Sequence, residues 1–371
     1  MHQKKSASLR VTVAAYGLMG FGLAGCDPSS PANAPSSVAK TSPDPVEAIS
    51  TLESGSAKLS RNSSGAVTQI TVRDAPVNES LMTAAASLPQ LQNLTLTGCE
   101  IDDAAAAQIG KLKNLRHLDL RDSKLGNAEL ATILGGSRDL QSLRLSGKTG
   151  ATTVDDAGMP ALKSLTHLKV LAADFLWVSD KGLAELTQLG ELRELYLANS
   201  LVDDAALAII AKMPNVKKLR LAKTGVTTVG MQHLTQLKLE DLDISECVSI
   251  DDAALEPVGS ITTLKKLNLW RDAIGDAGAA HLSPLVNLEW LNVDNTQVSD
   301  SGLRAFTNFK KLTFLHLGST PVTDAGMSSL TGLHSLAELK VTRTSVTEDG
   351  LIGLRQARPN LDIQLKYEKE E

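Results

Sequence analysis

Hydrophobic residues recur with a period of about 24 residues from Val67 to Leu365. The segments that begin at Leu288 and Leu312 share the pattern L-x-x-L-x-L-x-x-T-x-V-[ST]-D-x-G-[LM]-x-x-[LF]-x-x-[LF]. A period in this range is typical of solenoids, whose units must stack because none can bury its apolar face alone. Twelve units begin at Val67, Leu91, Leu115, Leu140, Leu168, Leu192, Val216, Leu239, Leu264, Leu288, Leu312 and Leu336.

Each unit combines two periodicities. The L-x-x-L-x-L half predicts a short strand with its leucines inward, and the second half has apolar residues at helical spacing. A Ser, Thr or Asp stands where the helix would begin, so it can accept hydrogen bonds from the free amides, and an acid beside it favours the positive end of the helix dipole. We therefore interpret four acidic pairs as helix caps rather than metal ligands: Asp102–Asp103, Asp155–Asp156, Asp203–Asp204 and Asp251–Asp252.

The units resemble leucine-rich repeats of the cysteine-containing class, L-x-x-L-x-L-x-x-[CTS]-x-[VI]-[TSD]-D-x-G-L. The resemblance spans about 300 of 371 residues. It implies an α/β horseshoe with parallel strands on the concave face and helices on the convex face. Family members are typically protein-recognition modules; the best known of the class follow an F-box, and the absence of an F-box-like segment before the array gives a ubiquitin-ligase role no support. The ninth position of the repeat is occupied by Cys99, Ser123, Ser200, Thr224, Cys247, Thr296, Thr320 and Thr344.

Charge and motifs argue against two classes of function. The chain has 37 basic and 42 acidic residues and no basic run, which argues against nucleic acid as a partner. It has no G-x-S-x-G motif, zinc spacing or phosphate loop. His117, Asp119 and Arg121 project from one strand, but scattered polar residues are expected on a concave ladder. We therefore expect no catalysis, no cofactor and no metal.

Two of the three cysteines, Cys99 and Cys247, occupy the same repeat position six units apart. Six strand spacings separate them by roughly 28 Å. A disulfide requires Cα atoms within about 7 Å, so these two cysteines cannot pair with each other. We interpret each as a small buried residue.

Residues 1–25 have the pattern of a bacterial lipoprotein signal peptide. Met1–Lys5 is basic, Val11–Gly22 is apolar, and L-A-G-C ends at Cys26. The apolar run is too short to span a bilayer comfortably and ends in small residues, as in a secretory leader. L-A-G-C resembles the lipobox, which implies lipid transfer to Cys26; an ordinary signal peptide is the alternative. We therefore expect a protein of the cell envelope that is lipid-anchored to a bacterial membrane and faces away from the cytoplasm.

The chain between the leader and the repeats divides into a tether and a cap. Residues 26–43 are rich in Pro, Ser and Ala and predict a disordered tether. Residues 44–66 predict an N-terminal cap with a helix over Pro45–Glu53, a strand over Ala57–Ser60 and a turn at Asn62–Gly65. Asp44 and Glu47 match a capping box. The repeat domain then covers residues 67–365, and residues 366–371 form a charged tail.

Strand positions between the inward leucines predict the concave face, and an aromatic group gathers there. Aromatic side chains among polar groups are typical anchors of recognition surfaces, and a leucine-rich face needs no tryptophan for stability. We predict that a protein ligand binds there; a glycan or cell-wall polymer is one alternative, and a purely architectural envelope protein, in which these rings only pack on their neighbours, is another. The candidate residues are Trp270, Trp290, Phe314, Asn268, Asn292 and His316.

The unit that begins at Leu140 is 28 residues long, with its extra residues around Gly147–Thr153. The next unit carries Phe175 and Trp177 at the matching edge. We expect these aromatic side chains to pack under the inserted loop, and a second contact site is the alternative.

Overall fold

A computed structural model describes residues 44–366 of the chain. The predicted signal peptide (1–25), Cys26, the tether (26–43) and all but the first residue of the charged tail lie outside the described residues. Within the described part, none of the helices has the length and hydrophobicity that crossing a bilayer requires.

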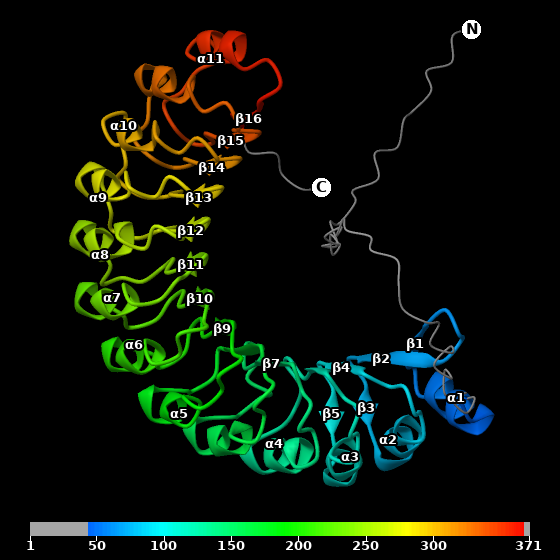
Figure 1. The fold of residues 1–371 in the computed structure, drawn as a ribbon. Helices are drawn as coiled ribbons and strands as arrows, with labels where there is room; N and C mark the ends of the chain where they lie inside the picture. Colours follow the sequence, from blue (N-terminus) through cyan, green and yellow to red (C-terminus); the bar gives the residue numbers. More distant parts are fainter. Residues whose placement is uncertain (1–43, 367–371) are drawn as a thin grey trace, which may run out of the picture. The chain divides into compact units, whose positions relative to one another are not determined.

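The described residues form a solenoid in which successive turns add strands to one sheet (Figure 1). This sheet has 14 strands, and β3 and β5 form a separate two-stranded sheet. The strands lie on the inner side of the arc and the helices on its outer side. From β2 onward the neighbours in the large sheet are parallel, whereas β1 is antiparallel to β2. This arrangement confirms the predicted α/β horseshoe.

The strand positions follow the period of the sequence. The strands are β1 (Lys58–Arg61), β2 (Val67–Arg73), β3 (Pro76–Val77), β4 (Asn93–Thr97), β5 (Glu100–Ile101), β6 (His117–Asp119), β7 (Ser142–Ser146), β8 (Val170–Asp174), β9 (Glu194–Tyr196), β10 (Lys218–Arg220), β11 (Asp241–Asp243), β12 (Lys266–Asn268), β13 (Trp290–Asn292), β14 (Phe314–His316), β15 (Glu338–Lys340) and β16 (Asp362–Gln364).

The helices are short, at most nine residues, so packing on the sheet rather than intrinsic propensity must hold them. Three are 3-10 helices. The helices are α1 (Val46–Ser54), α2 (Glu79–Ala86), α3 (Asp103–Ile109), α4 (Asn127–Leu134), η1 (Asp156–Leu162), α5 (Asp180–Ala184), α6 (Asp204–Ile210), α7 (Thr228–Leu234), η2 (Asp252–Ala254), α8 (Leu255–Gly259), α9 (Asp276–His281), α10 (Leu303–Phe306), η3 (Asp324–Leu330) and α11 (Ile352–Ala357).

Alternation along each strand separates the core from the concave face. In β13, Leu291 is fully buried, while Trp290 and Asn292 on either side are partly exposed. Successive side chains of a strand point to opposite faces, so the repeat leucines enter the core and their neighbours line the inner surface. Complete burial of a leucine stabilises the fold by about 1.5–3 kcal/mol relative to an exposed one.

The D-x-G part of the repeat joins neighbouring units. Asp276 Oδ1 accepts hydrogen bonds from the amides of Ser299 (2.7 Å) and Gly302 (2.9 Å), and its Oδ2 accepts one from the Ser299 hydroxyl (2.6 Å). A Cβ atom on Gly302 would lie 2.6 Å from Asp276 Oδ1, so only glycine leaves room for the carboxylate. Equivalent contacts to the following unit are made by Asp156, Asp204, Asp252, Asp300 and Asp324.

The acidic pairs therefore have two roles. The first member caps its own helix: Asp102 accepts a hydrogen bond from the Ala105 amide (2.6 Å), and Asp155, Asp203 and Asp251 act alike. This confirms the capping interpretation. The second member contacts the next unit in three of the four pairs, a role that the sequence interpretation missed.

At the N-terminal end, α1 and β1 cover the first repeat. Leu52 of α1 is fully buried, and β1 pairs with β2 through a turn closed by Asn62. The predicted capping box is wrong, because Pro45 is the N-cap residue and makes no side-chain cap bond. Asp44 instead accepts a hydrogen bond from the Val67 amide (2.7 Å) and lies 3.6 Å from Arg61 Nη1, so a tertiary contact replaces the local one.

Candidate ligand-binding surface on the concave face

Two predicted residues form a stacked aromatic pair. Trp290 of β13 and Phe314 of β14 are register partners, and their ring centroids lie 5.0 Å apart at an interplanar angle of 4°. In-register positions of parallel strands are about 4.8 Å apart, which matches the stacking distance of aromatic rings. Both side chains remain partly exposed on the concave face.

Lysines flank this pair at both ends. Lys266 of β12, the register partner of Trp290, places Nζ 4.7 Å from the Trp290 ring centroid. Lys340 of β15 places Nζ 5.5 Å from the Phe314 ring centroid. Cations at these distances are attracted to the ring faces. We call Lys266, Trp290, Phe314 and Lys340 the aromatic ladder; its two lysines were missed by the sequence interpretation, although the register places Lys266 beside Trp290.

The predicted polar residues lie in the next row. Asn292 accepts a hydrogen bond from the Asp294 amide (2.9 Å), and Asn268 donates one to Asp243 (3.0 Å). The His316 ring meets the Phe314 ring edge-on at 6.3 Å. Burial lowers the pKa of His316 although Asp294 opposes this effect, so the imidazole is neutral near pH 7.

Trp270 is not part of this group. Its ring packs against the Arg271 guanidinium, 5.3 Å from the ring centroid, and makes no ring contact with Trp290 or Phe314 in the described structure. It follows β12 rather than standing at the ladder position. The structure therefore brings together five of the six predicted residues, and Trp270 contacts them through its amide, which donates a hydrogen bond to Asn268 Oδ1 (3.3 Å), rather than through its ring.

A hollow of about 230 Å³ adjoins Trp290. Some of its charged groups are paired. Glu194 accepts hydrogen bonds from the Tyr196 hydroxyl (2.7 Å) and from Lys218 Nζ (2.8 Å). Arg220 lies 3.3 Å from Asp243. Among the described residues, Asp241 and Lys266 of the same hollow form no ion pair.

The prediction that Trp177 packs under the inserted loop is wrong. Trp177 is 74% exposed, while Phe175 is half-buried and the loop at Gly147 closes onto its backbone. The Trp177 backbone bridges to Asp155 of the preceding unit, and this position of the repeat faces outward. Leu201, the equivalent residue of the following unit, is also largely exposed. A second contact site at this edge stays a prediction.

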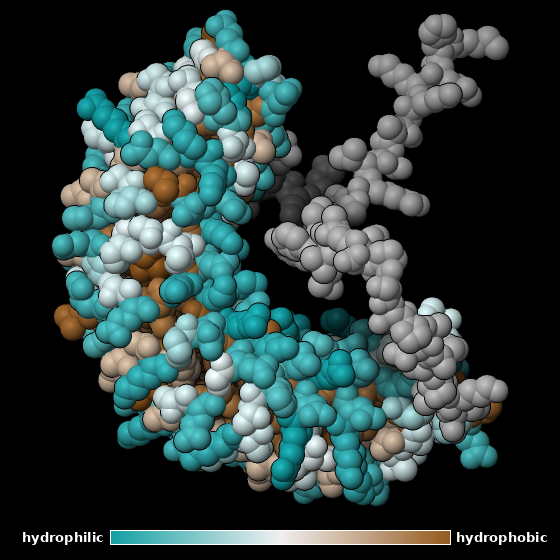
Figure 2. All heavy atoms as spheres, in the orientation of Figure 1, coloured by the Kyte–Doolittle hydropathy of each residue, from teal (hydrophilic) through white to brown (hydrophobic). Residues whose placement is uncertain are grey.

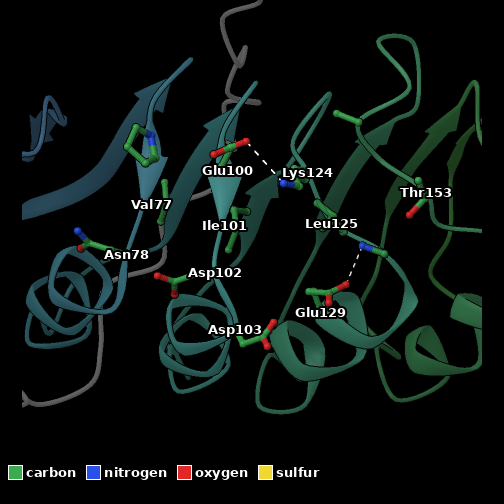
Figure 3. Close-up of a pocket in the computed structure, with 13 residues that line it drawn as sticks. Val77, Asn78, Glu100, Ile101, Asp102, Asp103, Lys124, Leu125, Glu129 and Thr153 are labelled. Carbon is green, nitrogen blue, oxygen red and sulfur yellow. Dashed lines mark hydrogen bonds and ion pairs between the residues drawn. The ribbon is translucent and has the colours of Figure 1, made fainter.

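A hollow of about 670 Å³ lies on the side of the solenoid beside β3 and β5 (Figure 3). Glu100 and Lys124 form an ion pair across it (3.7 Å), and Glu129 accepts a hydrogen bond from the Gly126 amide (2.8 Å). Asp102 is already used as a helix cap. These polar groups of the hollow therefore stabilise the repeats. Across residues 44–366, no three His, Cys, Asp or Glu residues form a cluster that could hold a metal ion.

Both cysteines of the repeats are buried and free. Burial raises the pKa of the Cys99 thiol and raises that of Cys247 to about 11. The Cys247 thiol donates a hydrogen bond to the Leu221 carbonyl (3.2 Å). Neither thiol has the depressed pKa of a nucleophile, which agrees with their interpretation as small buried residues.

The ninth repeat position contains an exception that the sequence interpretation missed. Asp272 stands where eight other units have Cys, Ser or Thr, and it is only 2% exposed. Its Oδ1 accepts a hydrogen bond from the Cys247 amide (3.0 Å), while Oδ2 has no partner in the described structure. Burial raises the pKa of Asp272 to about 8, against the lowering effect of that amide, and Asp243 and Glu246 add to the increase.

Fold and repeats together define a leucine-rich-repeat solenoid. Residues 66–156 match a family model described as "FBD-associated F-box protein At5g56370, LRR repeats", and residues 310–330 match one described as "Leucine Rich repeat". The sequence matches no curated protein.

Several solved structures are similar to this chain. An internalin of Listeria monocytogenes is 21% identical over 82% of this chain and 87% of its own, with a TM-score of 0.58. A leucine-rich-repeat protein of Leptospira interrogans is 19% identical over 76% of this chain and 80% of its own, with a TM-score of 0.48. A plant peptide hormone receptor, solved in complex with RGF2, is 19% identical over 80% of this chain and 46% of its own, with a TM-score of 0.45. At such identities the likeness to the internalin shows the fold alone.

Proposed function

We propose that this chain is a lipid-anchored, extracytoplasmic scaffold that recognises a protein through the aromatic ladder on its concave face. The observation that carries the proposal is the stacked, partly exposed pair Trp290–Phe314 between two lysines. Leucine-rich-repeat folds are typical of protein recognition. The surface is rigid because its strands are fixed by the repeat register, so binding orders few side chains.

The geometry favours a protein over a glycan that stacks on the rings. A sugar ring stacks on an aromatic face, but Trp290 has Phe314 on one side and Lys266 on the other, since these residues come from the strands on either side of β13. Ring edges and the Lys266 ammonium are left for a ligand, and the Lys340 ammonium is shared with Glu338 (3.2 Å). Such a surface suits an apolar side chain flanked by acidic ones. In Figure 2, hydrophilic residues predominate along the inner edge of the arc, as expected of the rim around an apolar anchor.

The binding test compares three versions of residues 27–371 in a crosslinking pull-down from envelope extract: native, Trp290→Ala/Phe314→Ala, and Val229→Ala as the control. Val229 is an exposed apolar residue of α7, on the outer side of the arc. Truncating an interface anchor costs about 2 kcal/mol or more, so we expect the double variant to lose a partner at least thirtyfold. Native and Val229→Ala proteins should capture it equally. Identical captured proteins in all three samples would exclude the aromatic ladder as the binding site.

The anchor is a separate part of the proposal. It is supported by the basic start, the apolar run and the L-A-G-C sequence that ends at Cys26. Labelled fatty acid should enter the native protein but not Cys26→Ala, and protease added outside the cytoplasmic membrane should degrade the repeats. Equal labelling of the two proteins would contradict lipidation at Cys26.

A further inference from the structure

A second hollow on the concave face, of about 350 Å³, lies over β2, β4, β6 and β7, far along the sheet from the aromatic ladder. Two register rows build it. One row contains Asn93, His117 and Ser142, and the other contains Thr95, Asp119 and Arg144. Leucines below these rows are buried, so the polar side chains alone face a ligand.

The Asp119 carboxylate, which lies beside Arg144, already has another partner. Asp119 is the register partner of Arg144, but its oxygens accept hydrogen bonds from Arg121 Nε (2.9 and 3.2 Å) and Nη2 (2.7 Å). Arg144 makes no ion pair within residues 44–366, whereas Arg121 and Arg220 on the same face are both paired. The Arg144 guanidinium therefore has no hydrogen-bonded acid, and Glu194, which is held by Lys218 and Tyr196, attracts it only at longer range.

The neutral groups around Arg144 also have no protein partners. Among the described residues, the side chains of Asn93, Thr95, His117 and Ser142 make no hydrogen bond, although Ser142 is only 8% exposed. Burial and the positive charges of Arg116, Arg144 and Lys169 lower the pKa of His117, so its imidazole is neutral and can both donate and accept. Of these four residues only Ser142 is buried; Asn93 and Thr95 are partly exposed, and His117 is exposed. Their side-chain donors and acceptors are not used within the described structure, so a polar ligand in the hollow can bond to them.

We propose that this hollow binds a sugar unit that carries a carboxylate, of the hexuronic acid type. Arg144 can hold the carboxylate through two parallel hydrogen bonds, a geometry that guanidinium matches and ammonium does not. Asn93, Thr95, His117 and Ser142 both donate and accept, as ring hydroxyls require. An acidic protein side chain would fill only the arginine end and leave the four neutral groups unpaired. The volume lies at the lower end of the range of small-ligand sites.

The test titrates the purified protein with three small probes and follows binding by ligand-observed NMR: glucuronate, glucose and glutarate. Glucuronate has both the carboxylate and the hydroxyls, and each of the others lacks one of them. We expect glucuronate to bind at least tenfold more tightly than glucose or glutarate. Arg144→Ala should weaken glucuronate at least tenfold and Arg144→Lys by less, while Arg304→Ala, which removes the same charge at α10 on the convex side, should have no effect.

Unchanged glucuronate affinity in Arg144→Ala would overturn the proposal. Glutarate binding as tightly as glucuronate would also overturn it and identify an acidic side chain as the ligand. If Arg144→Ala fails to fold by circular dichroism, Arg144→Lys and Asn93→Ala carry the same test. Trp290→Ala/Phe314→Ala should bind glucuronate normally, so this site and the protein-binding ladder can fail independently.

Discussion

A single methyl group added at Gly302 should destabilise the solenoid through the contact between units. Gly302 has helical backbone angles (φ −65°, ψ −32°), so alanine is not strained there. Its Cβ would lie 2.6 Å from Asp276 Oδ1 and 2.9 Å from Val298 Cγ1. The Asp276 carboxylate would have to retreat by several tenths of an ångström, which would weaken three hydrogen bonds of 2.6–2.9 Å.

The size of the effect follows from two contributions. Overpacking a tight site costs about 1–3 kcal/mol. Each hydrogen bond to a charged group contributes about 1.5–3 kcal/mol, and only part of this is lost when the bond lengthens. Alanine does not offset the loss, because Gly302 is the N-cap residue of α10 and glycine is preferred to alanine at that position. We therefore expect Gly302→Ala to lower the free energy of unfolding by about 2 kcal/mol.

Gly353→Ala is the matched control. Gly353 lies in α11, and no heavy atom comes within 4 Å of its added Cβ, so this variant should gain about 0.5–1 kcal/mol. Urea unfolding followed by circular dichroism gives the midpoint and slope of each variant. The slope must be compared because repeat arrays can lose cooperativity. Hydrogen exchange at the Ser299 and Gly302 amides, which donate to Asp276, reports the local contact.

A double-mutant cycle tests the cause. In Asp276→Ala the carboxylate is absent, so adding Gly302→Ala should cost about 1 kcal/mol less than it does in the native protein. Additive losses would show that the two residues do not interact. If Gly302→Ala has a free energy of unfolding no lower than that of Gly353→Ala, the contact between Asp276 and Gly302 does not stabilise the solenoid.

Three further predictions concern the core and the concave face. The pKa of Asp272 is about 8 in the folded chain and near 3.8 when unfolded, so the native state holds the proton and loses stability as the pH rises from 4 to 8. Asp272→Thr should thus exceed the native protein in urea stability by about 2–5 kcal/mol at pH 8 and by little at pH 4; a pH-independent difference would contradict this. Leu291→Ala should lower the free energy of unfolding by about 2–5 kcal/mol, because Leu291 is fully buried. Trp290→Ala/Phe314→Ala should lower it by less, and a larger loss in this double variant would favour an architectural role for the two rings. The Cys247 thiol should react with a disulfide reagent only as fast as the protein unfolds, and fast labelling of the native state would show that it is accessible.

The period of the sequence was sufficient to predict the fold and the aromatic pair. Trp290 and Phe314 are 24 residues apart, so a parallel ladder must place them side by side, and the structure stacks them. The strand leucines were predictable for the same reason. These predictions depend on backbone register alone.

Side-chain competition could not be read from the sequence. Asp119 has an arginine two residues away on its own strand and another beside it on β7, and the structure pairs it with the first. Asp44 could cap the helix that follows it or bond to a distant residue, and in the structure it accepts a hydrogen bond from the Val67 amide. Trp177 faces solvent because its position in the repeat points outward. The sequence interpretation did not assign a direction to this position.

The repeat constrains the two faces of each strand differently, and this explains where specific chemistry is found. Inward positions must be leucine or a close equivalent in every unit, but concave positions contact only the adjacent strands. The aromatic ladder on β12–β15 and the hollow over β2–β7 are roughly 24 Å apart along the sheet, counting five strand spacings from β7 to β12. Substitutions at that separation add independently. One rigid sheet can therefore hold an apolar, cation-flanked anchor at one end and a hydrogen-bonding hollow at the other, and each can change without disturbing the core that positions both.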